Sequence, residues 1–245
     1  VVDAYTMTEA VKDGITVNLV YDGRAAKVML NQDKVRQIEE YYAQCELEGA
    51  NEHQVEESQK AVAKMEVIIG DPDRLRAVAE DFIKHYETRV AEGATVAGKA
   101  MFVCSNRNIA YDFYKIVKEL RPEWTEKKIC DDGVVLSEKD KKELKPMEKI
   151  KLVMTRNKDD EKDLLDMLGT KEDRKEFDRQ FKNPKSNFKI AIVVDMWLTG
   201  FDVPELDTIY IDKPIQQHTL IQTISRVNRV CEGKDKGLIV DYIGI

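Results

Sequence analysis

The chain has 245 residues, of which 42% are hydrophobic, and it carries a formal net charge of −7. This length is enough for a full hydrophobic core in one or two domains. The negative charge excludes a protein that coats nucleic acid through a uniformly basic surface, although it leaves room for a local basic groove.

Membrane insertion and secretion are not indicated either. No apolar run approaches the roughly 20 residues of a membrane span, and no secretory signal opens the chain. The four cysteines are scattered and form no Cys-x-x-Cys pair, which is typical of free thiols in a reducing compartment. We therefore expect a cytoplasmic protein that makes no contact with a membrane.

Residues 1–30 are predicted to form a short helix over residues 8–13 and then an edge β-hairpin. The alternation of residues 15–21 predicts a strand. Asp22 and Gly23 are typical of a two-residue hairpin turn, so residues 25–30 are expected to return as the partner strand.

Residues 31–97 are highly charged and predict a helical segment that packs on the same domain. Helices are expected over residues 33–48 and 51–69, and a third is expected over residues 75–90. Asp71 is placed to cap this third helix, and Pro72 suits its first turn. No chemistry is indicated here; a surface for docking another subunit is the alternative role.

Residues 98–245 alternate between apolar runs and amphipathic stretches, which predicts a parallel α/β domain. The expected strands are residues 100–104, 151–155, 189–194, 208–211 and 238–241, and the expected helices are residues 107–120, 159–168, 171–181 and 218–230. Function in such folds lies at the carboxyl ends of the strands. Four polar residues fall at or just after those ends: Ser105, Thr155, Asp195 and Asp212.

Two groups of titratable residues carry no predicted chemistry. The lysine-rich run over residues 139–151 is interleaved with acids, which favours a solvated surface over a DNA-binding patch. His53, His85 and His218 are far apart in the sequence and have no metal-ligand spacing, so no metal is assigned to them.

The stretch around residues 218–230 combines an apolar face with a cationic face. At about 100° per residue, Gln222, Arg226 and Arg229 of the predicted helix fall within about 60° of one another. Leu220, Ile224 and Val227 fall on the opposite face. Guanidinium groups match phosphate oxygens and keep their charge, so this face suits a nucleotide phosphate. A solvated helix face with incidental arginines is the alternative.

Five segments follow one another in an order that identifies a family resemblance: residues 98–107, 151–155, 199–204, 210–214 and 237–244. Asp195-x4-Gly200-x-Asp202 followed by Gln222-x3-Arg226-x2-Arg229 resembles motifs V and VI of superfamily 2 helicases. The five segments together resemble the motor and restriction (R) subunit of type I restriction–modification enzymes. The resemblance is strong over residues 98–245 and weaker before them. It implies the second RecA-like lobe of a double-stranded DNA translocase.

For nucleotide binding, the resemblance implies that Asp202 contacts the ATP ribose. Arg226 and Arg229 then contact the γ-phosphate, with Arg229 as the arginine finger. Gln222 lies near the phosphates or couples them to DNA, and Gly200 lies between nucleotide and DNA. Ser225 stands where many relatives have Gly.

For DNA binding, the resemblance implies backbone contacts from Thr199, Ser105, Arg107 and Thr155. The last three are equally well explained as caps where a strand passes into a helix. Asp195 is expected to brace the turn at Thr199, or only to cap the end of its strand.

Three motifs that ATP hydrolysis or DNA cleavage would need are absent from the sequence. The sequence contains no Gly-x4-Gly-Lys-Ser/Thr loop, no acidic tetrad for Mg²⁺ and no nuclease constellation. We therefore expect ATP with Mg²⁺ to be bound mainly by a first lobe elsewhere in a longer chain, and the isolated fragment to be inactive. The implied partners are double-stranded DNA, the first motor lobe and nuclease domain of the same parent chain, and modification and specificity subunits.

Other functions stay open at this point. The lobe of another superfamily 2 motor, either an RNA helicase or a chromatin remodeller, is the nearest alternative. A non-catalytic scaffold lobe is a second alternative. A dinucleotide-dependent enzyme is not supported, because the sequence has no Gly-x-Gly-x-x-Gly turn.

Overall fold

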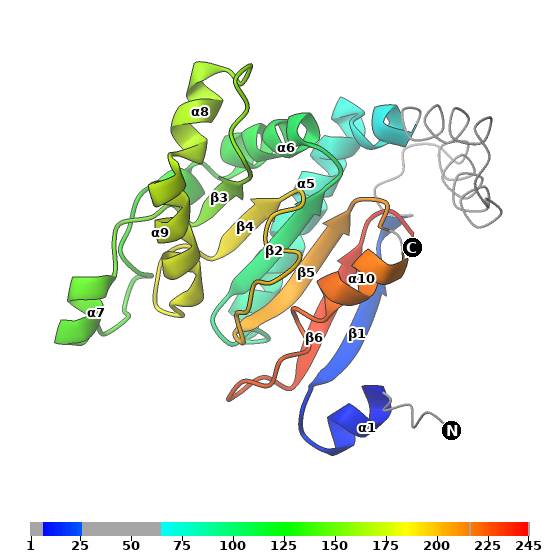
Figure 1. The fold of residues 1–245 in the computed structure, drawn as a ribbon, viewed down its shortest axis with the longest axis vertical. Helices are drawn as coiled ribbons and strands as arrows, with labels where there is room; N and C mark the ends of the chain where they lie inside the picture. The colour runs from blue at the N-terminus through cyan, green and yellow to red at the C-terminus, as the bar shows by residue number, and fades with distance from the viewer. Residues whose placement is uncertain (1–6, 26–64, 216, 245) are drawn as a thin grey trace.

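A six-stranded parallel sheet forms the centre of the protein (Figure 1). The computed structural model describes residues 7–25, 65–215 and 217–244. The strands are β1 (Asn18–Gly23), β2 (Lys99–Cys104), β3 (Ile150–Val153), β4 (Ile190–Val193), β5 (Leu206–Asp212) and β6 (Lys236–Asp241), in the order β1-β6-β5-β2-β4-β3. Every pairing between them is parallel, which confirms the predicted α/β class.

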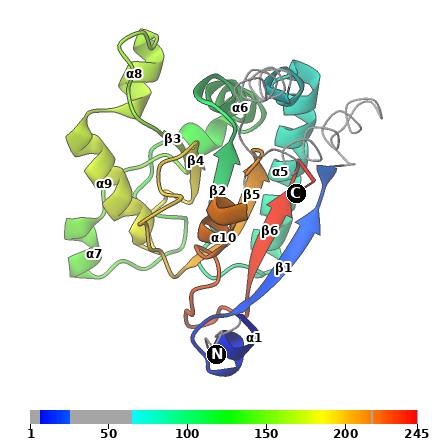
Figure 2. The same ribbon diagram turned by 45° about the vertical axis from the view of Figure 1, so that its right-hand side comes forward.

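Helices cover both faces of this sheet (Figures 1 and 2). The described helices are α1 (Met7–Lys12), α5 (Pro72–Ala91), α6 (Arg107–Leu120), the 3-10 helix η1 (Pro122–Thr125), α7 (Glu138–Glu143), α8 (Lys162–Leu168), α9 (Lys171–Lys182) and α10 (Gln217–Ile224), of which α1 lies beyond the end of β1 (Figure 1). None of the helices in the described ranges has both the length and the apolar character needed to cross a membrane.

The two faces of the sheet carry separate hydrophobic clusters, as the alternation of side chains along a strand requires. Phe102 of β2 points toward α5 and α6, where it stacks on Phe113 at 4.0 Å and meets Phe82 edge-on at 5.2 Å. Its neighbours Met101 and Val103 point to the opposite face, which α9, α10 and the segment after β4 cover. The strands are therefore buried on both sides.

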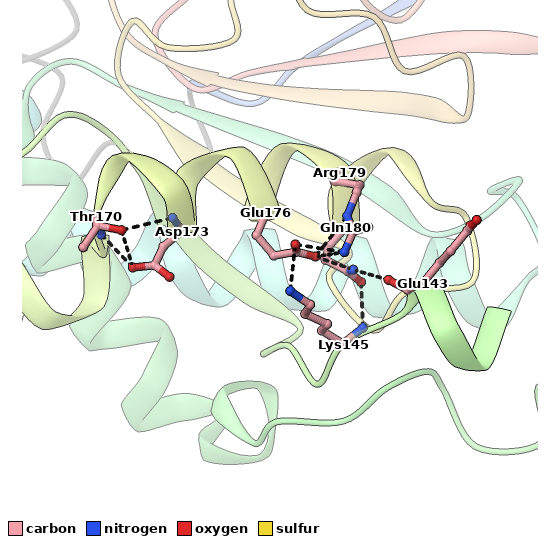
Figure 3. Close-up of polar contacts among 7 residues, drawn as sticks. All are labelled: Glu143, Lys145, Thr170, Asp173, Glu176, Arg179 and Gln180. Carbon is pink, nitrogen blue, oxygen red and sulfur yellow. Dashed lines mark hydrogen bonds and ion pairs between the residues drawn. The ribbon is translucent and has the colours of Figure 1, made fainter. Parts of the chain in front are cut away.

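Local capping explains where several helices begin. The Asp71 side chain accepts a hydrogen bond from the Arg74 amide at 3.1 Å, and Pro72 occupies the first turn of α5. Asn106 caps α6 in the same way. Thr170 and Asp173 form a reciprocal capping box at the start of α9 (Figure 3). These starts confirm the predicted helices after Asp71 and over residues 107–120.

The predicted N-terminal hairpin is wrong. Asp22 and Gly23 do not turn; they continue β1 and lie opposite Val240 and Asp241 of β6. Parallel pairing with β6 makes β1 the edge strand of the main sheet, because long-range pairing overrides the local turn preference. Residues 26–64, which include most of the predicted return strand and helix 33–48, lie outside the described residues.

The lysine-rich run is a charge-mixed surface, as the sequence indicates. Its ion pairs include Lys139–Glu143, Lys141–Glu138, Lys145–Glu176, Lys151–Glu148 and Asp140–Lys185. The Glu176 carboxylate also accepts hydrogen bonds from Arg179 and from the buried Gln180 side chain (Figure 3). Gln180 in turn donates to the Glu143 carbonyl at 2.9 Å, which ties α9 to α7.

The cysteines in the described ranges, Cys104, Cys130 and Cys231, are free thiols. Cys45 lies outside those ranges.

Candidate functional site

The polar residues that follow the strands meet at one edge of the sheet, because all six described strands are parallel. Ser105 follows β2 and donates its hydroxyl hydrogen to the carbonyl oxygen of Asp212, the last residue of β5, at 2.9 Å. Thr155 follows β3 and Asp195 follows β4. The structure thus brings together the strand ends that the sequence predicts to carry function.

The segment after β4 forms a tight turn that exposes predicted site residues. Gly200 adopts φ +68°, and apart from the adjoining residues no atom lies within 4 Å of where its Cβ would be. Thr199 and Asp202 are exposed, whereas Phe201 is buried. Gly200 therefore serves a left-handed backbone conformation with open space on its outer side.

Asp195, directly after β4, forms an ion pair with Lys213. The Lys213 ammonium lies 2.6 Å from the Asp195 carboxylate and also donates to the Val194 carbonyl at 3.0 Å. The contact joins the end of β4 to the segment after β5, and the expected bracing of the turn at Thr199 stays a prediction.

The helix that was expected to carry both arginines is shorter than predicted. α10 ends at Ile224, and residues 225–227 form a turn in which the Val227 amide donates to the Ile224 carbonyl at 3.1 Å. Arg229 lies beyond this turn, in an antiparallel bridge with Thr16. The prediction of one helical face was wrong because the backbone beyond Val227 bonds to the segment before β1. The apolar side was predicted correctly, since Val227 is buried and Leu220 and Ile224 pack against the same cluster.

Arg226 connects the two predicted motifs. Its Nη1 atom donates to the Phe201 carbonyl at 2.7 Å, and its Nε atom donates to the Gln222 carbonyl at 3.2 Å. Gln222 is half-buried and its carbonyl also accepts from the Ser225 hydroxyl. In this conformation the Arg226 guanidinium holds the end of α10 against the turn after β4.

Arg229 and Asp202 come together although they do not share a helix. The Arg229 Nε atom lies 3.4 Å from the Asp202 carboxylate, and their side chains are 53% and 61% exposed. A cation and a carboxylate of the two predicted motifs therefore occupy one accessible spot on the surface. Both side chains are accessible to solvent, as the predicted contacts with a nucleotide require.

Arg107 and Thr155 also meet, but within an ion-pair network. The Arg107 guanidinium donates to the Thr155 carbonyl and makes a two-pronged contact with Asp160 at 2.5 and 2.7 Å. Burial opposes ionisation of Asp160, but hydrogen bonds from the Asn157 amide and from Arg107 outweigh it and hold the pKa of Asp160 below its usual value. The positive charge of Arg107 is thus already neutralised.

A buried ion pair behind the strand ends escaped sequence reasoning. Arg74 of α5 is fully buried and contacts the Asp212 carboxylate at 2.5 Å. It also donates to the carbonyls of Ile69 and Tyr242 at 3.1 and 3.2 Å. Asp212 was visible as a strand-end residue, but no sequence signal links it to a helix that begins at Pro72. The pair fixes α5, β5 and the segment after β6 to one another.

These residues fit part of a nucleotide site. The exposed Asp202 and Arg229 and the open side of Gly200 suit the edge of a bound nucleotide, whereas the sequence offers no Gly-x4-Gly-Lys loop to hold its phosphates. Within the described ranges, no group of three or more His, Cys, Asp or Glu side chains is arranged to hold a metal ion.

A shallow hollow lined by Glu143, Arg179, Gln180, Lys182, Asn183 and Pro184 lies between α7 and α9. It lies on neither motif, and Arg179 and Lys182 are paired with Glu176 and Asp178. We therefore do not assign the nucleotide to it.

Comparison with known proteins identifies the family. Residues 96–244 match the model of type I restriction enzyme subunit R domain 3. The type I restriction enzyme HindI endonuclease subunit from Haemophilus influenzae is 36% identical over 247 residues, which cover 100% of this chain and 21% of that protein. A protein from Methanocaldococcus jannaschii, assigned as the MjaIXP endonuclease subunit, is also 36% identical, over 246 residues and 21% of its length.

A solved structure has the same fold. It is a fragment assigned as the HsdR subunit of a type I restriction enzyme from Vibrio vulnificus YJ016, with a TM-score of 0.52 and 12% identity over 96% of this chain and 34% of that one. The chain spans about a fifth of the length of the curated relatives that it matches. By its match to the domain 3 model and to these relatives, the chain belongs to the R-subunit family of type I restriction enzymes.

Proposed function

We propose that this chain is the second motor lobe of an ATP-dependent translocase on double-stranded DNA, within the R subunit of a type I restriction enzyme. The observation that carries the proposal is the pairing of Asp202 with Arg229 at an exposed position beside Gly200. Asp202 contacts the ribose, and Arg229 reaches the γ-phosphate of ATP held with Mg²⁺ mainly by another lobe.

The chemical contribution of this lobe is electrostatic. Charge builds up on the oxygens of a phosphoryl group during its transfer, and a guanidinium stabilises that charge. An arginine finger is typically worth about 10³ to 10⁵ in rate, and only when the phosphate is already bound by other groups. The chain by itself therefore neither hydrolyses ATP nor binds it tightly.

DNA contact belongs to the same edge of the sheet. Thr199 is exposed on the turn after β4, and Ser105, Arg107 and Thr155 follow β2 and β3. Together they contact phosphates of the DNA backbone, with Arg107 doing so only when a phosphate competes with its partner Asp160, while other subunits of the enzyme carry out modification and sequence recognition. The nuclease domain of the parent chain performs the cleavage.

The deciding experiment is DNA-stimulated ATP hydrolysis by the parent R subunit, with Arg229→Ala compared to the wild type. The matched control is Arg76→Ala, since Arg76 is also an exposed arginine in an ion pair but lies on α5. We expect Arg229→Ala to lose at least about a thousandfold in rate with ATP binding retained, and Arg76→Ala to keep the wild-type rate. An unchanged rate in Arg229→Ala would make the motif structural and the lobe a scaffold.

DNA tracking has its own test, because contacts to phosphates release counterions. The affinity of the parent enzyme for DNA without a recognition sequence should fall steeply with salt concentration. A flat dependence on salt would contradict backbone contacts.

A further inference from the structure

The backbone of Trp197 is left-handed, with φ +69°. In the described part of the chain it is the one residue other than glycine with a positive φ. A left-handed conformation costs a side chain with a Cβ about 1–2 kcal/mol, and such residues persist only where their surroundings hold them. Trp197 stands in the turn after β4, three residues before Gly200.

Aromatic packing holds this conformation in place. Trp197 as a whole residue is 9% exposed, and its ring stacks on the ring of Phe201, with centroids 4.2 Å apart and planes at 2°. Phe181 of α9 packs against it at 5.3 Å, and Phe188 lies at 6.3 Å. Each such aromatic contact stabilises the fold by about 0.5–1.5 kcal/mol beyond simple burial. The stack therefore offsets the free-energy cost of the left-handed backbone at Trp197.

The stack fixes both ends of the segment that carries the exposed site residues. Thr199 and Gly200 lie between the two stacked residues, and Asp202 follows directly. The ring of Phe201 is held by Trp197, and its carbonyl oxygen accepts the hydrogen bond from Arg226. Because the outer side of Gly200 is open, the shape of this turn depends on its inner, aromatic side.

We propose that Trp197 is a positioning residue: its left-handed backbone and its stack on Phe201 fix the turn so that Asp202 faces Arg229 before a nucleotide binds. Trp197 itself touches no nucleotide. The inference deepens the proposed function, on which its kinetic readout rests. It also links α9, through Phe181, to the position of Asp202.

The test uses the parent R subunit with Trp197→Ala, which removes the stack, and Trp197→Phe, which keeps an aromatic ring. Trp124→Phe is the matched control, because Trp124 is a buried tryptophan on the opposite face of the sheet. Two quantities are measured: amide hydrogen exchange of residues 198–203 without nucleotide, and the KM and kcat of ATP hydrolysis.

We expect Trp197→Ala to speed exchange in residues 198–203 by about tenfold and to raise the KM for ATP by a similar factor, with kcat little changed. Trp197→Phe and Trp124→Phe should stay within about threefold of the wild type. A merely structural role would lower the active fraction, which reduces kcat and leaves KM unmoved.

A second variant covers the case in which Trp197→Ala does not fold. Phe201→Leu removes the stack from the other side and should produce the same rise in exchange at residues 198–203. Wild-type exchange in both variants would overturn the positioning role. If the variants exchange faster but the wild-type parent protein does not hydrolyse ATP, the positioning role stands and the proposed function is rejected. Failure of the positioning role and failure of the proposed function therefore give different results.

Discussion

Arg229 and Asp202 form an ion pair at 3.4 Å between the segment after α10 and the turn after β4, which Arg226 also joins through the Phe201 carbonyl. Both side chains are more than half exposed, and such pairs contribute about 0–1 kcal/mol to stability. The pair therefore costs little to break. Under the proposed function, a nucleotide phosphate would draw Arg229 away from Asp202.

The exposure of Arg229 predicts that its removal has little effect on the stability of the fold. Arg229→Ala should change the free energy of unfolding of the 245-residue chain by less than about 1 kcal/mol in urea denaturation. Arg226→Ala, which removes the hydrogen bonds to the Phe201 and Gln222 carbonyls, should cost about 1–3 kcal/mol. A larger cost for Arg229→Ala than for Arg226→Ala would contradict the assignment of Arg226 as the brace.

The network at Arg107 predicts an unusual effect of removing a negative charge. Asp160→Asn should release the Arg107 guanidinium, so that the DNA affinity of the parent enzyme rises and its dependence on salt steepens by about one phosphate contact. Asp140→Asn is the charge-matched control, since Asp140 pairs with Lys185 beside α7. Equal salt dependence in the two variants would remove Arg107 from the DNA contacts.

The buried pair of Arg74 and Asp212 predicts a large loss of stability. Arg74→Met leaves the fully buried Asp212 carboxylate without its guanidinium partner, which should cost about 3–5 kcal/mol in urea denaturation. Arg76→Ala, two positions along the same helix but exposed, should cost less than about 1 kcal/mol. Similar losses from the two substitutions would show that the Arg74 pair is not what fixes α5.

His85 predicts a pH dependence of stability. Burial, followed by the charges of Arg24 and Arg89, lowers the pKa of His85 from 6.5 to about 4, although Asp22 and Asp81 act in the opposite direction. Between these values the unfolded chain binds the proton and the folded chain does not, so stability is complete above pH 6.5 and falls as the pH drops toward 4.

The measurement is the urea midpoint of the wild type and of His85→Asn at pH 7 and at pH 5. The wild type should lose more stability on acidification than His85→Asn, which has no imidazole to protonate. The Nδ1 atom of His85 lies 2.9 Å from the Tyr210 hydroxyl. Loss of this contact is expected to lower the stability of His85→Asn equally at pH 7 and at pH 5. Identical pH dependence would contradict the lowered pKa.

Features that depend on neighbours in sequence were predictable. Buried strands appear as short apolar runs, such as residues 190–193 of β4, because a parallel sheet with helices on both sides buries every position. The starts of helices are equally predictable from the sequence, because Asp71 and Pro72 influence the backbone only within the first turn of α5. The strand ends that carry Ser105 and Asp195 follow from the same local patterns.

Features that depend on distant partners were not predictable. The end of α10 at Ile224 is set by pairing with a distant segment, in which the Val17 amide donates a hydrogen bond to the Asn228 carbonyl. The turn preference of Asp22 and Gly23 is real, but six residues of parallel pairing with β6 outweigh it. No local pattern distinguishes Arg74 from the other arginines of α5, because its partner Asp212 becomes a neighbour only after folding.

The pairing of β1 with β6 also limits when the sheet can finish folding during synthesis of the chain. Tyr21 and Asp241 lie 220 residues apart in the chain, yet their strands are adjacent. During synthesis β1 therefore leaves the ribosome long before β6, the strand that pairs with it. Until β6 is made, β5 also has one unpaired edge. Open strand edges are templates for pairing with other chains. A chain that ends before Lys236 would expose the edges of β1 and β5 that β6 covers in the complete sheet, and it would therefore be prone to aggregate.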